Sequence, residues 1–354
     1  MVELDPVHLQ YIELFIVTME QLFIKADEEN LNINQDLLKR IENWTQTKEI
    51  VEIKDKYNIG LESEVGADIT FGIPYFKNFF TKFKATAKSS HSLKVELKNN
   101  IEPKLSDLIA LCNGLITNVR LEVVAKGRKD ILIIIEDLDK IPLDRAKNLF
   151  FNYLNQLIQL ETNVIYTFPV ALYYSLKFNE IKSYFHIIHE LHMIKVSDKK
   201  GEEVDEGIEA MKAIVKARMD LNIFEEVDIL ENMILKSGGC LRDLFYLIRE
   251  ASEAAYDEDR KIINDEDFSQ AYLKLKSDYE NTIADYIEDG KVKYTADQYF
   301  TTLVNLANDE TKKITNTEAS LHLRQNLTIL GYNGENWCDV HPIVRDILKE
   351  RELL

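Results

Sequence analysis

The sequence predicts an α/β fold whose core is a parallel sheet, followed by two smaller C-terminal domains. Residues 131–135 are all aliphatic, and a continuous apolar run is typical of a parallel strand covered on both faces. A helical pattern over 144–161 and a second short apolar strand, 163–169, follow along the chain. Strand, helix and strand in this order indicate the βαβ arrangement of a parallel sheet.

The residues before the first strand are predicted to be mostly helical. Residues 7–26 carry a broad apolar face at helical spacing, 35–44 continue as a second helix, and 103–126 form a helix that leads to the strand. Glycines, a proline and aromatic residues in 63–80 indicate a strand or loop at 67–74. Lysines are frequent from 76 to 104, and we expect a solvated surface there rather than a binding site.

After the second strand, 170–185 indicates a helix and a turn, and 191–196 indicates the last core strand. A helical lid follows. Asp220 and Asn264 stand at plausible turn and cap positions in it. The lid is predicted as four helices: 206–220, 225–236, 241–256 and 265–279.

The C-terminal residues predict a winged helix. Helices at 294–306 and 317–326 precede two short strands joined by Asn333-Gly334, a strong hairpin signal. Pro342 then opens the closing helix, where proline is favoured at the first position. We expect the neighbouring His341 to be structural, because a metal site needs three or four ligands.

Polar side chains stand at the ends of both predicted strands. Glu136, Asp137 and Asp139 follow the first strand, and Thr167 lies near the end of the second. Open α/β sheets bind ligands at the carboxyl ends of their strands, and carboxylates there can bind Mg²⁺. Taken alone, the three acids fit equally well an acidic turn after a core strand.

A third motif, Ser-Gly-Gly-Cys-Leu-Arg-Asp-Leu at 237–244, places paired glycines at the end of one lid helix and Arg242 at the start of the next. Arg242 is therefore either a ligand-binding cation or the partner of Asp243 or another nearby acid.

Taken in order, these three motifs resemble the AAA+ and STAND class of P-loop ATPases, and more narrowly a group of bacterial ATP-binding proteins. The likeness covers nearly the whole chain. It implies a P-loop NTPase core with a helical insertion at 1–200, a helical lid at 201–278 and a C-terminal winged helix at 279–354.

The resemblance also implies ATP and Mg²⁺ as cofactors. Glu136 would bind Mg²⁺, and Asp137 would polarise the attacking water and share the metal. Thr167 would be sensor 1, Arg242 would be sensor 2 at the γ-phosphate, and Asp139 would share the nucleotide site. The first acid of such a pair is usually Asp, so the division of roles among the three acids stays open.

The phosphate loop of the family, G-x-x-x-x-G-K-[ST], does not occur in the sequence. The Gly-Lys pair at Gly290-Lys291 is followed by valine, and residues 5–26 resemble the part of the family that follows its second strand. The core is thus similar to a P-loop domain that is incomplete at its N-terminus. Because that loop positions the phosphates, we expect the chain alone to bind ATP weakly or not at all.

Three functions are compatible with these motifs. The first is the ATPase module of a nucleotide-dependent molecular switch, a class that often serves in bacterial regulation or phage defence, competent only if the phosphate loop is supplied. The second is a non-catalytic pseudo-ATPase scaffold that binds a protein partner. The third is an initiator-like DNA-binding ATPase, although its predicted recognition helix, 317–326, carries only Arg324 and His322 as cations. No arginine finger stands in 170–185, where Lys177 and Lys182 are the cations.

Composition indicates a cytoplasmic protein with a protein partner or effector. The net charge of −18 disfavours nucleic-acid binding, which depends on Lys and Arg at phosphates. The sequence has no apolar run of about 20 residues, which a membrane span would need. Its N-terminal residues lack the basic start of a signal peptide. Cys112, Cys240 and Cys338 are widely separated, and we expect them to be reduced and packed.

Overall fold

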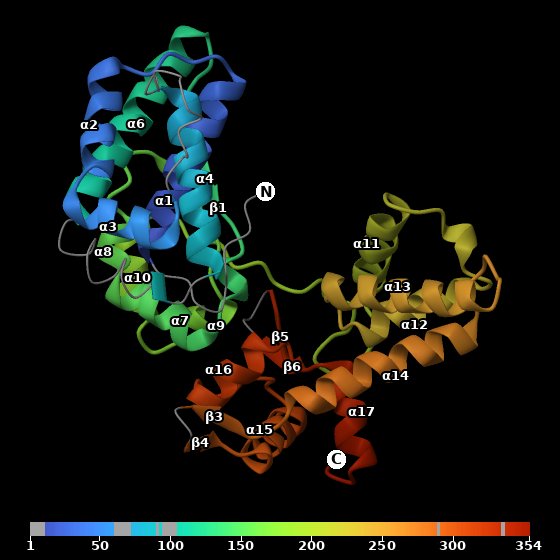
Figure 1. Ribbon diagram of the computed structural model, residues 1–354. Helices are drawn as coiled ribbons and strands as arrows, with labels where there is room; N and C mark the ends of the chain where they lie inside the picture. The colour runs from blue at the N-terminus through green and yellow to red at the C-terminus, as the bar shows by residue number, and fades with distance from the viewer. Residues whose placement is uncertain (1–10, 60–71, 90–91, 94–104, 289–290, 334–336) are drawn as a thin grey trace. The chain divides into compact units, whose positions relative to one another are not determined.

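The structure, a computed structural model, describes residues 11–59, 72–89, 92–93, 105–288, 291–333 and 337–354. These residues are mostly helical, and their strands form three two-stranded sheets. The chain divides into two compact units (Figure 1). Unit 1 is Met1–Leu172 with Lys177–His186, and unit 2 is Tyr173–Leu176 with Ile187–Leu354.

Unit 1 begins with a helical layer. Its helices are α1 (Tyr11–Glu28), α2 (Gln35–Thr45), α3 (Lys48–Tyr57), α4 (Ile73–Ser89) and α6 (Leu105–Ala125). Helix α1 packs along α4 and α6 (Figure 1). Aromatic side chains fill the contact, since Phe23 of α1 stacks on Phe76 and Phe80 of α4 with ring centroids 5.4 and 5.9 Å apart.

The helices expected at 7–26, 35–44 and 103–126 are confirmed where the structure describes them. The strand or loop expected at 67–74 falls largely outside the described residues, and from Ile73 onward the chain is helical.

Helix α6 corrects the expectation that no segment is long and apolar enough to cross a membrane, because its length and composition pass that test. Its side chains Leu108, Cys112 and Leu115 are fully buried, and the helix packs against α1 and α2. Such burial is typical of a core helix in a soluble protein.

The βαβ arrangement is confirmed at the level of two strands. β1 (Leu132–Ile135) and β2 (Asn163–Tyr166) pair in parallel, with Ile135 opposite Tyr166. Short helical pieces connect and follow them: η2 (Leu138–Lys140), α7 (Leu143–Lys147), the π-helical turn η3 (Asn148–Asn152), α8 (Leu154–Leu157), α9 (Val170–Tyr173) and α10 (Phe178–Tyr184).

The sheet differs from the expectation in its size and its burial. No larger parallel sheet is present in the described part of the chain. Among the described residues, one face of the strand pair is exposed, since Leu132, Ile134 and Ile165 are 55%, 53% and 50% exposed. The opposite face packs inward, and the Tyr166 hydroxyl donates to the Leu157 carbonyl at 2.8 Å. The prediction that both faces are covered is therefore wrong for this structure.

The core strand predicted at 191–196 is also wrong, because this segment belongs to unit 2 and forms no strand with β1 or β2. The Met193 amide donates to the Gly331 carbonyl at 3.0 Å, and the Ile194 amide donates to the Gly239 carbonyl at 3.2 Å. The segment is thus held by the lid and the C-terminal module.

The four lid helices of unit 2 are confirmed, with small shifts of their ends. They are α11 (Asp205–Lys216), α12 (Val227–Lys236), α13 (Leu241–Asp257) and α14 (Asp265–Thr282), with a 3₁₀ turn, η4 (Leu221–Ile223), between the first two. Helix α14 runs along α13 and contacts α17 (Figure 1).

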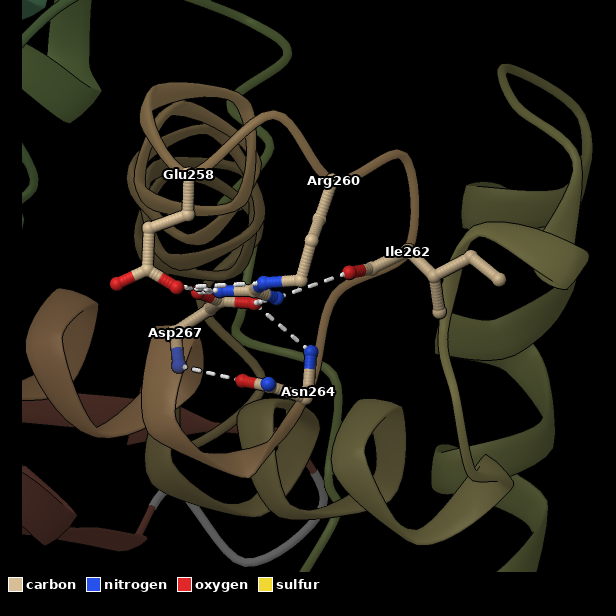
Figure 2. A network of polar contacts seen from close by, with 5 residues as sticks. All are labelled: Glu258, Arg260, Ile262, Asn264 and Asp267. Atoms are coloured by element: carbon tan, nitrogen blue, oxygen red, sulfur yellow. Dashed lines mark hydrogen bonds and ion pairs between the residues drawn. The ribbon is translucent and has the colours of Figure 1, made fainter.

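The start of α14 shows why the helix begins there (Figure 2). Asn264 accepts from the Asp267 amide, and Asp267 accepts from the Asn264 amide, which completes a capping box. Arg260 donates to both carboxylate oxygens of Asp267 at 2.6 Å each, and it also contacts Glu258 and the Ile262 carbonyl (Figure 2). The predicted cap at Asn264 is confirmed, and the arginine that reinforces it is an addition.

The C-terminal module has the predicted helix, helix, hairpin and helix. Its elements are α15 (Ala296–Asn308), α16 (Glu318–Gln325), β5 (Ile329–Tyr332), β6 (Trp337–Val340) and α17 (Pro342–Glu350). β5 and β6 pair in antiparallel fashion, while residues 334–336 of the expected turn lie outside the described residues. The hairpin of β3 (Tyr286–Glu288) and β4 (Lys291–Tyr294) was not expected.

Candidate functional site

The acidic loop, defined here as Glu136 to Lys140, starts where β1 ends. Glu136 is exposed, and Asp137 adopts a left-handed backbone with φ of 68°. Non-glycine residues in that conformation are uncommon and often mark functional sites. The Asp137 carboxylate lies 2.6 Å from Lys140 Nζ, so the proposed catalytic acid is paired with a cation of its own loop.

Thr167 lies directly beside the acidic loop. Its amide donates to the Ile135 carbonyl at 3.1 Å, which continues the parallel pairing by one residue. Its hydroxyl oxygen accepts from the Leu138 amide at 3.1 Å. The fold thus brings the hydroxyl at the end of β2 together with the acids at the end of β1.

The acidic loop is not a closed metal cage. In the described parts of the chain, no three His, Cys, Asp or Glu side chains are grouped so that they can hold a metal ion. Mg²⁺ usually keeps several waters and takes one or two carboxylates together with substrate phosphates. A site of that kind needs fewer protein ligands than a closed cage, and the acidic loop offers the carboxylates of Glu136, Asp137 and Asp139.

The paired glycines of the 237–244 motif form a tight turn. Gly238 and Gly239 have φ of 59° and 79°, and a Cβ at Gly239 would lie 1.7 Å from the Ile194 carbonyl oxygen. The Gly238 carbonyl accepts from the Tyr332 hydroxyl at 2.8 Å. Glycine is needed here because the turn packs against both the 191–196 segment and β5.

Asp243 of the same motif points into unit 2. Its Oδ2 accepts from the Tyr279 hydroxyl at 2.6 Å and lies 3.0 Å from His341 Nε2. Burial raises the pKa of Asp243, but His341, the Tyr279 hydroxyl and the charge of Arg242 outweigh it and hold this pKa below its usual value. Asp243 is therefore a buried carboxylate with its own partners, and His341 is structural as expected.

Arg242 is exposed on the first turn of α13. Among the residues that the structure describes, it forms no ion pair, because Asp243 is turned toward Tyr279 and His341. The alternative of an Arg242–Asp243 salt bridge is not what the structure shows. Arg242 belongs to unit 2, whereas the acidic loop and Thr167 belong to unit 1.

The two cations of α16, the predicted recognition helix, are engaged within unit 2. Arg324 is 5% exposed, and its guanidinium carbon lies 3.7 Å from the ring centroid of Tyr174. His322 packs against Tyr286 and Tyr294, with ring centroids 4.3 and 5.6 Å apart. Neither side chain presents a charge that is ready to contact a DNA phosphate.

The three cysteines do not contribute a reactive thiol. Each is buried and free of disulfide bonds, as expected. Burial raises the pKa of Cys112 and of Cys240 to about 12, so both remain protonated at neutral pH.

Sequence reasoning missed the partners of the key side chains. Lys140 stands three residues after Asp137, and that spacing in a turn is a signal that could have suggested the pair. Tyr279 and Tyr174 carry no such signal, because each meets its partner, Asp243 or Arg324, only through the tertiary fold.

Compared with family models, with curated proteins and with solved structures, the chain has no match.

Proposed function

We propose that this chain is the nucleotide-responsive module of a molecular switch that resembles AAA+ and STAND ATPases. The observation that carries the proposal is the hydrogen bond from the Leu138 amide to the Thr167 hydroxyl, 3.1 Å long. It joins the hydroxyl at the end of β2 to the backbone of the loop that carries the acids at the end of β1. Mg²⁺ takes one or two carboxylates together with substrate phosphates, and open α/β sheets bind ligands at the carboxyl ends of their strands, which supports a nucleotide at this place.

Each candidate residue has a role in this proposal. Glu136 and Asp137 bind Mg²⁺, Asp137 also orients the attacking water, and Asp139 shares the nucleotide site. Thr167 holds the acidic loop and senses the terminal phosphate. Arg242 contacts the γ-phosphate, and its exposed guanidinium, which forms no ion pair with the residues that the structure describes, supports that role. When bound, ATP and Mg²⁺ supply the phosphoryl group and the charge that neutralises it.

The phosphate loop is the part of such a site that the sequence lacks. We propose that catalysis requires this loop to be supplied, and that the chain alone keeps only weak affinity for Mg-ATP. The protein then acts in the cytoplasm on a protein effector, in regulation or phage defence.

Nucleotide titration of the chain tests the proposal. We expect Mg-ATP to bind with a dissociation constant on the order of 1 mM, because most phosphate contacts are missing. NMR chemical shifts follow the binding. Asp137→Ala removes a magnesium ligand and should abolish this binding. The matched control is Asp144→Ala, because Asp144 is an exposed acid outside the loop. If 10 mM Mg-ATP, on the order of tenfold above that constant, changes the spectrum of none of the three proteins, the proposal is contradicted.

A non-catalytic scaffold is the second candidate, and two observations favour it. The Asp137 carboxylate is already paired with Lys140, and one face of β1 and β2 exposes Leu132, Ile134 and Ile165. A scaffold predicts no nucleotide effect in the same titration. The initiator-like alternative has less support, because Arg324 is buried against Tyr174.

A further inference from the structure

The lid and the C-terminal module meet at one buried carboxylate. Asp243 of α13 accepts from Tyr279 of α14 at 2.6 Å, and His341 at the start of α17 lies 3.0 Å from the same oxygen. All three side chains are buried. In a low-dielectric interior, directional contacts of this kind hold both sides to one geometry.

The ring of His341 is held by a hydrogen bond at Nδ1. Its Nδ1 accepts from the Ile343 amide at 3.2 Å and caps α17, which assigns the ring proton to Nε2, facing Asp243. Its own amide donates to the Thr328 carbonyl at 2.9 Å, and the Tyr279 ring centroid lies 4.5 Å from its ring. The lid contact is therefore built into the first turn of α17.

Backbone packing adds a second connection beside the first. A Cβ at Gly238 would lie 2.6 Å from Leu330 Cδ1 and 2.8 Å from Pro342 Cδ. The Gly238 carbonyl also accepts from Tyr332 of β5. The turn between α12 and α13 thus lies in direct contact with β5 and α17.

A third connection lies at the middle of α17. Asp346 accepts from the Tyr272 hydroxyl of α14 at 2.8 Å and pairs with Lys236 of α12. One continuous apolar cluster runs beneath these contacts and includes Met211 and Leu247 of the lid and Leu303 of the C-terminal module. The two parts share a single core.

We infer that the lid and the C-terminal module form one rigid, cooperative body, so that Arg242 and helix α16 can only move together. Arg242 precedes Asp243 on α13, and the buried junction fixes the helical turn that carries it. Asp243 and Tyr279 are therefore positioning residues for Arg242. That a nucleotide engages Arg242 rests on the proposed function, whereas the rigid body does not.

The first test measures whether a substitution that destabilises the lid also destabilises the C-terminal module. In a Trp44→Phe background, Trp337 of β6 is the remaining tryptophan and reports unfolding of the module. The side chain of Met211 in α11 is fully buried, so Met211→Ala creates a cavity in the lid. We expect the Trp337 transition to shift to lower urea by as much as the transition that hydrogen exchange measures in 205–236.

Leu273→Ala serves as the control, because Leu273 is an exposed lid residue and its truncation should leave the Trp337 transition in place. A Trp337 transition that keeps its wild-type midpoint in Met211→Ala, while 205–236 loses protection, overturns the inference.

The second test removes one hydroxyl from the junction. Tyr279→Phe keeps the ring and should raise amide exchange roughly fivefold in both 241–257 and 342–350. Tyr246→Phe is the matched control, since the Tyr246 hydroxyl donates to Asp278 within the lid. Faster exchange confined to 241–257 would show two separable domains. Neither test uses a nucleotide, so failure of the proposed function leaves both results interpretable.

Discussion

The carboxylate of Asp243 gives the 237–244 motif a structural reason that its sequence does not reveal. Two partners, Tyr279 and His341, come from helices that follow at a distance along the chain. Sequence spacing can place residues on one helical face, but it cannot bring together side chains from three helices. The fold therefore buries Asp243 and leaves its neighbour Arg242 exposed in the first turn of α13.

Replacing Asp243 tests this role through pH. At pH 7 we expect Asp243→Asn to lower the free energy of unfolding of unit 2 by about 2 kcal/mol, the scale for losing hydrogen bonds to a buried charged group. Because the folded pKa of Asp243 is depressed, its stabilisation is present above its unfolded pKa and is lost as pH falls through the folded value.

Urea unfolding followed by Trp337 measures the effect, and the gap between wild type and Asp243→Asn should close below about pH 4. A gap that persists unchanged at pH values below the folded pKa of Asp243 would show that the carboxylate charge is not what stabilises the junction.

The close approach of Gly239 to Ile194 makes a second prediction at this scale. A Cβ in Gly239→Ala would meet backbone at 1.7 Å, so unit 2 must open at the turn, at a cost well above the roughly 1–2 kcal/mol of a left-handed alanine alone. Gly201→Ala is the control, because Gly201 has a similar φ of 83° with open space around it. Thermal unfolding should separate the two variants clearly, and equal losses would refute the steric argument.

The elements that were predicted best are those whose sequence signals lie within the element itself. Lid and C-terminal helices have apolar spacing and caps that can be read directly, and the Asn264 cap is an example. The aliphatic run at 131–135 did predict a parallel strand, and that pairing placed Thr167 beside the acids. The run could not show whether another layer covers Leu132 and Ile134, because apolarity reports a preference and not a neighbour.

The prediction of a core strand at 191–196 was wrong for a related reason. Its apolar residues suggested a core strand, but its amides donate to Gly331 and Gly239, so its backbone is satisfied outside any sheet of unit 1. Extended apolar segments look alike in sequence whether a sheet or a loop receives them.

The start of α14 carries a prediction at the element scale. Asp267→Ala removes both the capping box and the two-pronged contact with Arg260, and should cost about 2–3 kcal/mol. Asp265→Ala, at an exposed position of the same turn, should stay within about 0.5 kcal/mol of wild type. Chemical denaturation of unit 2 measures both, and similar losses would mean that the network in Figure 2 contributes little.

At the scale of the whole molecule, the candidate residues are divided between two units. Unit 1 carries the acidic loop and Thr167, and unit 2 carries Arg242. The sequence predicted these residues through motif order, whereas the shared core of lid and C-terminal module emerged only from the fold. Under the proposed function, Arg242 is the residue through which nucleotide state would reach the whole of unit 2.

Discrimination between ATP and ADP tests that central claim most directly. The affinities of wild type and Arg242→Ala for Mg-ATP and Mg-ADP are measured by NMR titration, with Arg249→Ala as the control, since Arg249 is exposed and paired with Glu250. We predict that wild type and Arg249→Ala prefer ATP by roughly tenfold, the scale of one charge-assisted phosphate contact, and that Arg242→Ala loses the preference. An unchanged preference in Arg242→Ala would contradict a switch that reads the γ-phosphate through unit 2.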